Sequence, residues 1–272
     1  MSPSPKPAER TLHLAESNST VLVFADADAA SKAAADRIVR IIAQAVAARG
    51  KAILGLATGA TPEKVYDDLA ARVRDGGLSF RDVTTYNLDE YYPIQPLDAL
   101  SYRTYMHRHL FSRVDLAPNR AHILDGTVPE TFASEHAAQF DRWIDDDGGL
   151  DLQLLGIGRN GHIGFNEPLD LTVEAFAALP TRLVDLHPIT KVDAVREFGS
   201  VDAVIPRALT MGVRQILGAR TILMLATGPK KAAIVAEALK GPITAAVPAS
   251  LLRTVADKVV WLLDEPAAAE LG

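Results

Sequence analysis

The sequence predicts an open, doubly wound α/β fold of the Rossmann-like kind, in which helices cover both faces of a mostly parallel sheet. Short apolar runs with little polar alternation, such as Thr20–Ala25 and Leu150–Ile157, are typical of strands buried on both faces. Longer segments with apolar residues at helical spacing, such as Ala27–Arg49, separate these runs, and this alternation indicates a parallel sheet. The composition agrees, because 48% hydrophobic residues with only 6% aromatic ones suit aliphatic strands beside alanine-rich helices.

The predicted elements follow one another in a regular rhythm. The strands are expected at Thr20–Ala25, Ala52–Ala57, Val83–Leu88, Leu150–Ile157, Thr221–Ala226 and Val259–Leu263. The helices are expected at Ala27–Arg49, Pro62–Arg74, Tyr102–Arg113, Thr131–Ile144, Val192–Phe198, Ala208–Leu217 and Lys230–Lys240. No linker-like composition interrupts this series. We therefore expect a single domain over residues 13–272, preceded by a mobile, proline-containing leader at residues 1–12.

Charge and composition limit the kinds of partner that the protein is expected to bind. A formal net charge of -6 argues against nucleic acid, whose phosphates are bound by excess Lys and Arg, but a small anion needs only a locally positive pocket. The chain has no cysteine, which excludes disulfides and thiolate chemistry. It shows neither a secretory signal nor an apolar run of roughly 18 residues. We expect a cytoplasmic protein without a membrane partner, and a homo-oligomer stays open.

Ligands of open α/β sheets bind beyond the carboxyl ends of the strands, so these ends are where chemistry is expected. The first one is ATGATP, at residues 57–62. Gly59 allows a ligand to approach the backbone, and the N–H groups that follow through Ala60 and Thr61 face an anion. Thr61 is expected to cap the next helix and Pro62 to begin it. The segment is either a phosphate cradle or an ordinary capped turn.

The second strand end, TYNLDEYYP at residues 85–93, carries two adjacent carboxylates among aromatic side chains. A carboxylate held there, such as Asp89, can act as a general base on carbon or oxygen. The alternative interpretation is a solvated acidic turn, in which Asp89 and Glu90 have no special environment.

The third strand end, GRNGHIGFNEP at residues 158–168, combines three glycines with His162 and Glu167. If the loop folds back, the carboxylate of Glu167 reaches the imidazole and orients it for proton transfer. Two other interpretations stay open. A metal site would need more ligands than these two residues supply, and a loop histidine can simply bond to backbone.

The fourth strand end, ATGPKKAA at residues 226–233, places Lys231 in the first turn of a predicted helix. Positive charge is unfavourable there unless an anion lies opposite, which favours a phosphate. A solvated lysine is the alternative. Arg196 in VDAVREF is a further candidate anion contact.

Together these segments resemble the glucosamine-6-phosphate deaminase family. The resemblance runs from about Ala52 to the C-terminus through LGLATGATPEKVY, YNLDEYY, SYRTYMHRHLF, LLGIGRNGHIGFNEP, ALTMGVRQIL and DEPAAAEL, in the family's order. It implies an enzyme that converts glucosamine 6-phosphate and water to fructose 6-phosphate and ammonia, without metal or organic cofactor, within N-acetylglucosamine catabolism. It therefore implies a hydrolase that also isomerises its substrate.

The resemblance also implies residue roles. Asp89 corresponds to the enolisation base, His162 to the ring-opening acid/base and Glu167 to its paired carboxylate. Asn160 takes a position at which family members carry Asp or Asn, and it adds hydrogen bonds without charge. The phosphate would be bound by the backbone of Gly59, Ala60 and Thr61 and by the side chains of Lys231 and Arg196.

Three alternatives remain. A galactosamine-6-phosphate deaminase/isomerase would need nearly the same groups. A 6-phosphogluconolactonase shares the fold but lacks the FNEP ending and the NLDEY form. A sugar-phosphate sensor would not require the three acid/base residues together, and no basic or helix-turn-helix segment precedes the fold.

Overall fold

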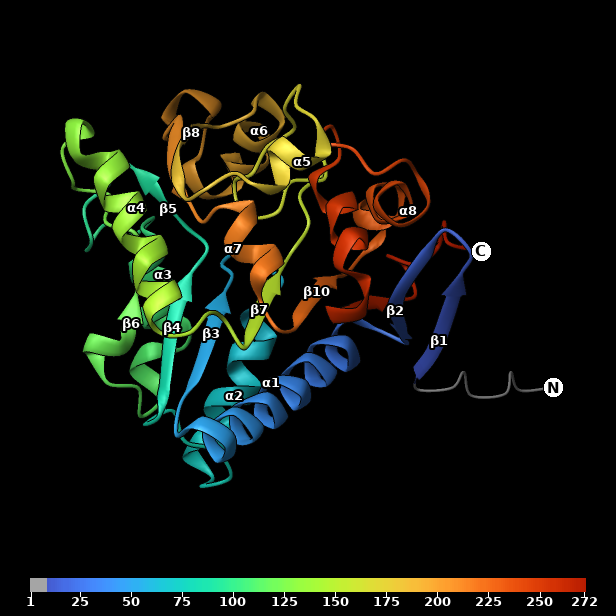
Figure 1. Ribbon diagram of the computed structural model, residues 1–272, viewed down its shortest axis with the longest axis horizontal. Helices are drawn as coiled ribbons and strands as arrows, with labels where there is room; N and C mark the ends of the chain where they lie inside the picture. Colours follow the sequence, from blue (N-terminus) through green and yellow to red (C-terminus); the bar gives the residue numbers. More distant parts are fainter. Residues whose placement is uncertain (1–8) are drawn as a thin grey trace.

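The computed structural model describes residues 9–272. Its centre is an eight-stranded sheet with the order β1-β2-β11-β10-β7-β3-β4-β6, in which only the β1–β2 pair is antiparallel (Figure 1). The strands are β1 (Glu9–Leu14), β2 (Ser17–Phe24), β3 (Ala52–Leu56), β4 (Val83–Asn87), β6 (Ala121–His122), β7 (Leu152–Leu155), β10 (Ile222–Ala226) and β11 (Val259–Asp264). The predicted α/β class is confirmed.

Helices cover both faces of this sheet. On one face lie α1 (Ala27–Arg49), α2 (Glu63–Arg74) and α3 (Tyr102–His109), followed by a short 3-10 turn. On the other face lie α4 (Glu130–Asp146), α5 (Val173–Ala177), α7 (Val213–Gly218), α8 (Ala232–Lys240) and the 3-10 segment Pro248–Lys258. Helix α1 has the predicted bounds because Asp26 caps its start and Gly50, at φ 73°, ends it.

The strands divide their side chains between two cores. Alternate residues of β2 show the division: Val21 and Val23 face the α4 side, whereas Leu22 and Phe24 face α1. All four are at most 4% exposed. Because both faces are buried, these strands read as continuous apolar runs, which is why the sequence revealed them.

A second, three-stranded antiparallel sheet was not predicted. It consists of β5 (Asp89–Tyr92), β9 (Arg207–Thr210) and β8 (Arg182–Asp185), in the order β5-β9-β8. The predicted helix at Ala208–Leu217 is therefore wrong over its first part, since only α7 is helical there. The reason is tertiary: β9 pairs with a strand on each side, and these pairings outweigh its local helical pattern.

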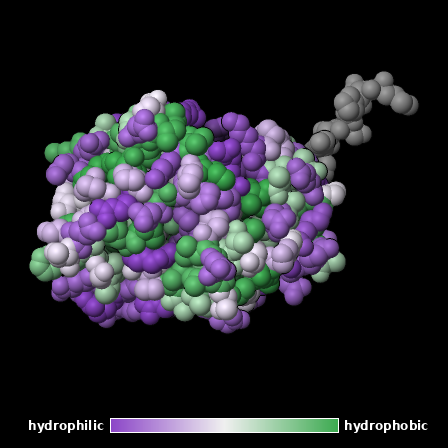
Figure 2. Space-filling model, turned by 90° about the horizontal axis from the view of Figure 1, so that it is seen from above, coloured by the Kyte–Doolittle hydropathy of each residue, from purple (hydrophilic) through white to green (hydrophobic). Residues whose placement is uncertain are grey.

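The predicted leader also needs correction. Residues 9–12 belong to β1, which pairs with β2 from Glu9↔Phe24 to Leu14↔Ser17, whereas residues 1–8 lie outside the described part of the chain. Within residues 9–272 no helix is long and apolar enough to span a membrane. Viewed from above, the end of the molecule that carries α5 and α6 (Pro188–Phe198) has hydrophilic and hydrophobic side chains interspersed (Figure 2).

Candidate functional site

A cleft of about 670 Å³ lies beyond the carboxyl ends of β3, β4, β7 and β10. Strands β7 and β3 are neighbours in the sheet. The next strand of this sheet after β3 is β4, beside β3, and the next after β7 is β10, on the opposite side of the pair, so the cleft lies where the strand order reverses direction. All four predicted strand ends contribute to its wall. The predicted residues among those that line it are Gly59, Ala60, Thr61, Asp89, His162, Arg196 and Lys231.

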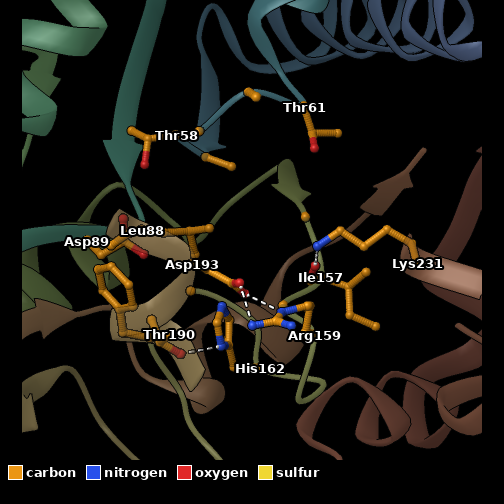
Figure 3. A pocket seen from close by; sticks show the side chains of 18 of the residues that line it. Thr58, Thr61, Leu88, Asp89, Ile157, Arg159, His162, Thr190, Asp193 and Lys231 are labelled. Atoms are coloured by element: carbon orange, nitrogen blue, oxygen red, sulfur yellow. Dashed lines mark hydrogen bonds and ion pairs between the residues drawn. The ribbon is translucent and has the colours of Figure 1, made fainter. Parts of the chain in front are cut away.

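The loop after β3 forms one wall of the cleft (Figure 3). Gly59 has φ 95°, a conformation that favours glycine, and its carbonyl accepts a hydrogen bond from the Tyr105 hydroxyl at 2.7 Å. The predicted helix start is wrong by one residue, since Pro62 is the N-cap and α2 begins at Glu63. No side chain caps this end, so Thr61 is not occupied with the helix and faces the cleft.

Lys231 lies across the cleft from this loop (Figure 3). It ends the 3-10 turn Pro229–Lys231 and directly precedes α8, rather than lying within the helix as predicted. Its ammonium donates to the carbonyl of Ile157 at 2.6 Å, which draws it inward. Burial lowers the pKa of Lys231, with Arg159 acting in the same direction and Asp193 opposing them. An anion bound beside Lys231 would favour its charged ammonium and so raise this pKa again.

Asp89 lies at the side of the cleft away from Lys231 (Figure 3). It is the first residue of β5 and is only 6% exposed. Burial, with a smaller contribution from Glu90, raises the pKa of Asp89 to about 8. Among the described residues, no side chain or backbone group hydrogen-bonds its carboxylate. This combination keeps a basic carboxylate available to a ligand.

Glu90, the other carboxylate of the predicted pair, is bound to the start of helix α3. Its oxygens accept hydrogen bonds from the Ser101 hydroxyl at 2.7 Å and from the backbone N–H groups of Tyr102 and Arg103 at 2.8 and 3.0 Å. These are the first groups of α3, so Glu90 satisfies the N-terminus of that helix. Neither carboxylate lies in a solvated turn, because both are buried in β5.

His162 projects into the cleft from a tight loop that follows β7 (Figure 3). Gly158 donates its N–H to the carbonyl of His162 at 3.0 Å, and Gly161 donates to Gly158 at 3.0 Å. A Cβ at Gly158 would lie 2.3 Å from the imidazole, so a larger residue there would displace the ring. The glycines of the motif thus bring the backbone against the histidine ring.

Glu167 holds the imidazole from behind. Its Oε2 lies 3.1 Å from His162 Nδ1 and its Oε1 accepts from the Thr190 hydroxyl at 2.7 Å. The loop therefore folds back as the sequence suggested. Although burial opposes ionisation, the hydrogen bonds from His162, Thr190 and Asn160 lower the pKa of Glu167 to about 2. An ionised Glu167 makes Nδ1 the donor and leaves Nε2 for a ligand.

Asn160 completes this arrangement without lining the cleft. Its amide Nδ2 donates to Glu167 Oε2 at 2.8 Å, and its Oδ1 accepts from the His162 backbone N–H at 3.3 Å. An ionised aspartate could not donate the first of these bonds and would repel the carboxylate of Glu167. The asparagine is thus matched to a Glu167 that is ionised at neutral pH.

Helix α6 contributes residues that the sequence did not single out. Thr190, Asp193, Ala194 and Glu197 line the cleft at the i, i+3, i+4 and i+7 spacing of one helix face, and Arg196 lines it as well. Asp193 forms an ion pair with Arg159 of the His162 loop. The helical spacing of these residues is visible in the sequence, but the sequence does not show that this face of α6 points toward the cleft, because that depends on the tertiary fold.

Within residues 9–272, no three His, Cys, Asp or Glu side chains gather to hold a metal ion.

Replacing Glu167 with Gln should lower the free energy of unfolding at pH 7 by about 2 kcal/mol, allowing for solvent screening. The folded-state pKa of Glu167 is depressed, so its stabilisation is present above pH 4.5 and is lost as the pH falls toward 2. The difference between the Glu167→Gln variant and the unmodified protein should shrink over that window. Chemical denaturation between pH 7 and pH 2.5 measures this, and a difference independent of pH would contradict it.

The fold and this cleft are those of an α/β enzyme that acts on a small ligand, and comparison with known proteins identifies its family. The family described as glucosamine-6-phosphate isomerases/6-phosphogluconolactonase matches residues 25–165, and the chain belongs to it. Glucosamine-6-phosphate deaminase of Bacillus velezensis is 45% identical over 86% of this chain and 93% of its own length. That of Rhodopirellula baltica is 42% identical over 88% of this chain and 92% of its own.

Solved structures give the same placement. A monomeric glucosamine-6-phosphate deaminase superposes with a TM-score of 0.85 at 37% identity, covering 92% of this chain and 99% of its own. The 6-phosphogluconolactonase of Trypanosoma brucei superposes with a TM-score of 0.77 at 20% identity, covering 94% of this chain and all of its own. The second likeness concerns the fold alone.

Proposed function

We propose that this enzyme deaminates and isomerises glucosamine 6-phosphate, producing fructose 6-phosphate and ammonia with consumption of one water. The observation that carries the proposal is the pairing of two different proton-transfer groups in one cleft. Asp89 is a buried carboxylate without a protein hydrogen-bond partner among residues 9–272, and His162 is an imidazole held by a charged Glu167. The deaminases of Bacillus velezensis and Rhodopirellula baltica support the same reaction.

The two groups suit two different steps. Opening the sugar ring moves a proton at oxygen, for which an imidazole with a free Nε2 is appropriate. Moving a proton from C2 to C1 requires a base at carbon, and the raised pKa of Asp89, about 8, makes its carboxylate more basic than an exposed one. Loss of ammonia from the resulting C2 imine by addition of water completes the reaction. Glu167 and Asn160 position His162 and do not face the ligand.

The phosphate is bound at the opposite end of the cleft. Gly59, Ala60 and Thr61 offer backbone N–H groups, and Lys231 and Arg196 offer positive charge. In this arrangement the sugar lies between Lys231 at the phosphate end and Asp89, with His162 beside its ring. Figure 3 shows the places of these three side chains. We assign the enzyme to amino-sugar catabolism from N-acetylglucosamine in the cytoplasm, as a hydrolase that also isomerises.

A lactonase is the second candidate, favoured by the joint description of the family and by the fold shared with 6-phosphogluconolactonases at 20% identity. Lactone hydrolysis needs no base at carbon, so it leaves the buried position of Asp89 without a purpose. Galactosamine 6-phosphate differs from the proposed substrate only at C4.

The test is ammonia release from glucosamine 6-phosphate, run beside galactosamine 6-phosphate and 6-phosphogluconolactone. We expect ammonia and fructose 6-phosphate from the first compound at a higher kcat/KM than from the second. Turnover of the lactone alone would overturn the proposed function.

A further inference from the structure

Helix α6 lines the cleft, and its apolar anchoring is confined to Ala194 and to Phe198, whose ring packs edge-on against Tyr91. Of its 11 residues only Thr190 and Ala194 are buried. Its outer side chains Ile189 and Val192 are 38% and 53% exposed. Because only Ala194 and Phe198 anchor α6 by apolar contacts, polar contacts contribute more to its position.

One polar contact joins α6 to the His162 loop directly. The guanidinium of Arg159 binds the carboxylate of Asp193 at two points, Nε to Oδ2 at 2.9 Å and Nη2 to Oδ1 at 2.7 Å (Figure 3). A two-point Arg–carboxylate pair fixes orientation as well as distance, which a single-point pair does not. The pair links loop and helix across 34 positions of sequence.

The Arg159–Asp193 pair lies between two residues of α6 that belong to the cleft. Asp193 lies three residues after Thr190, which donates to Glu167, and three residues before Arg196, which lines the same cleft and is a proposed phosphate ligand. Arg159 itself lies three residues before His162. Fixing the middle of α6 therefore fixes, at once, the Thr190 contact behind the imidazole and the direction of Arg196.

We propose that Arg159 and Asp193 form an ionic clasp that positions α6 over the cleft, so that phosphate binding and the orientation of His162 depend on one another. Both are positioning residues, acting through Thr190 and Arg196. The inference rests on the proposed function for its kinetic consequences, but its consequence for phosphate binding does not require turnover.

The test compares Arg159→Gln, Asp193→Asn and the double variant. Partly exposed ion pairs contribute up to about 1 kcal/mol, so each single variant should lower kcat/KM by about two- to fivefold, with kcat reduced and KM raised together. Because both changes break the same clasp, the double variant should lose no more than either single one. Arg113→Gln, which breaks an exposed pair with Asp67 outside the cleft, is the matched control and should keep full activity.

Calorimetric titration with inorganic phosphate distinguishes the clasp from direct binding of phosphate by Arg159. We expect Arg159→Gln and Asp193→Asn to weaken phosphate binding to a similar degree. If Arg159 were instead a direct phosphate contact, Asp193→Asn would tighten binding by removing a negative charge, and this would overturn the clasp. The clasp would also be overturned if the loss of kcat/KM in the double variant equalled the product of the two single losses, or if the single variants changed KM alone. Wild-type protein that binds phosphate in this way but releases no ammonia would refute the proposed function and leave the clasp standing.

Discussion

Replacing Asp89 with Asn should lower kcat by about 10²- to 10⁴-fold, the usual contribution of a positioned general base, while KM changes little. Asparagine has the same shape but cannot accept the proton from C2. Exchange of the substrate's C2 hydrogen with solvent deuterium, followed by mass spectrometry, isolates this step. Wild-type exchange in Asp89→Asn would exclude Asp89 as the base.

The same substitution should stabilise the protein. The pKa of Asp89 is raised to about 8 in the folded state, so its acid stays protonated there while the unfolded chain ionises near pH 4. Stability is therefore lost as the pH rises through this range, and a neutral amide avoids the loss. We expect Asp89→Asn to raise the unfolding free energy at pH 8 by on the order of 3 kcal/mol, and by little at pH 4.

Two controls accompany the Asp89 experiment. In the wild-type enzyme kcat/KM should rise with pH up to about 8, because only the ionised carboxylate accepts a proton. Glu90→Gln should keep kcat near the wild-type value, since it changes the hydrogen bonds to the start of α3 and leaves the base at Asp89 in place. A loss of kcat in Glu90→Gln as large as that in Asp89→Asn would contradict the different positions assigned to these neighbouring carboxylates.

The contrast between Asp89 and Glu90 also shows how far the sequence could lead. Strand runs buried on both faces and the Gly50 helix stop are local patterns, so α1 and the central strands were predictable. The split between the two carboxylates is not local. It depends on β5 pairing with β9, with Asp89 opposite Thr210, and on the approach of α3 to Glu90.

The same limit applies within the cleft. Asn160, His162 and Glu167 lie in one short loop, so their association could be inferred from spacing, and the structure places them in contact. Thr190 and Asp193 reach the loop from α6, 23 and 34 positions away from their partners, and no pattern in the sequence indicated those contacts.

Replacing His162 with Gln should likewise lower kcat by about 10²- to 10⁴-fold, but at a different step. Glutamine fills part of the same space and can hydrogen-bond Glu167, yet it cannot carry a proton to and from the ring oxygen. Overall turnover from cyclic glucosamine 6-phosphate should therefore fall further than proton exchange at carbon. With fructose 6-phosphate and ammonium, deuterium incorporation at C1 should persist in His162→Gln and be lost in Asp89→Asn.

The ratio of carbon exchange to turnover is thus the quantity that separates the two groups. It should rise in His162→Gln, because the base at carbon is intact, and fall in Asp89→Asn. Glu167→Gln provides the graded comparison: it keeps the imidazole but loses the charged acceptor of Nδ1, so its turnover should lie between wild type and His162→Gln. Equal ratios in the two single variants would mean that one residue serves both steps, and the assignment of oxygen chemistry to His162 would then be wrong.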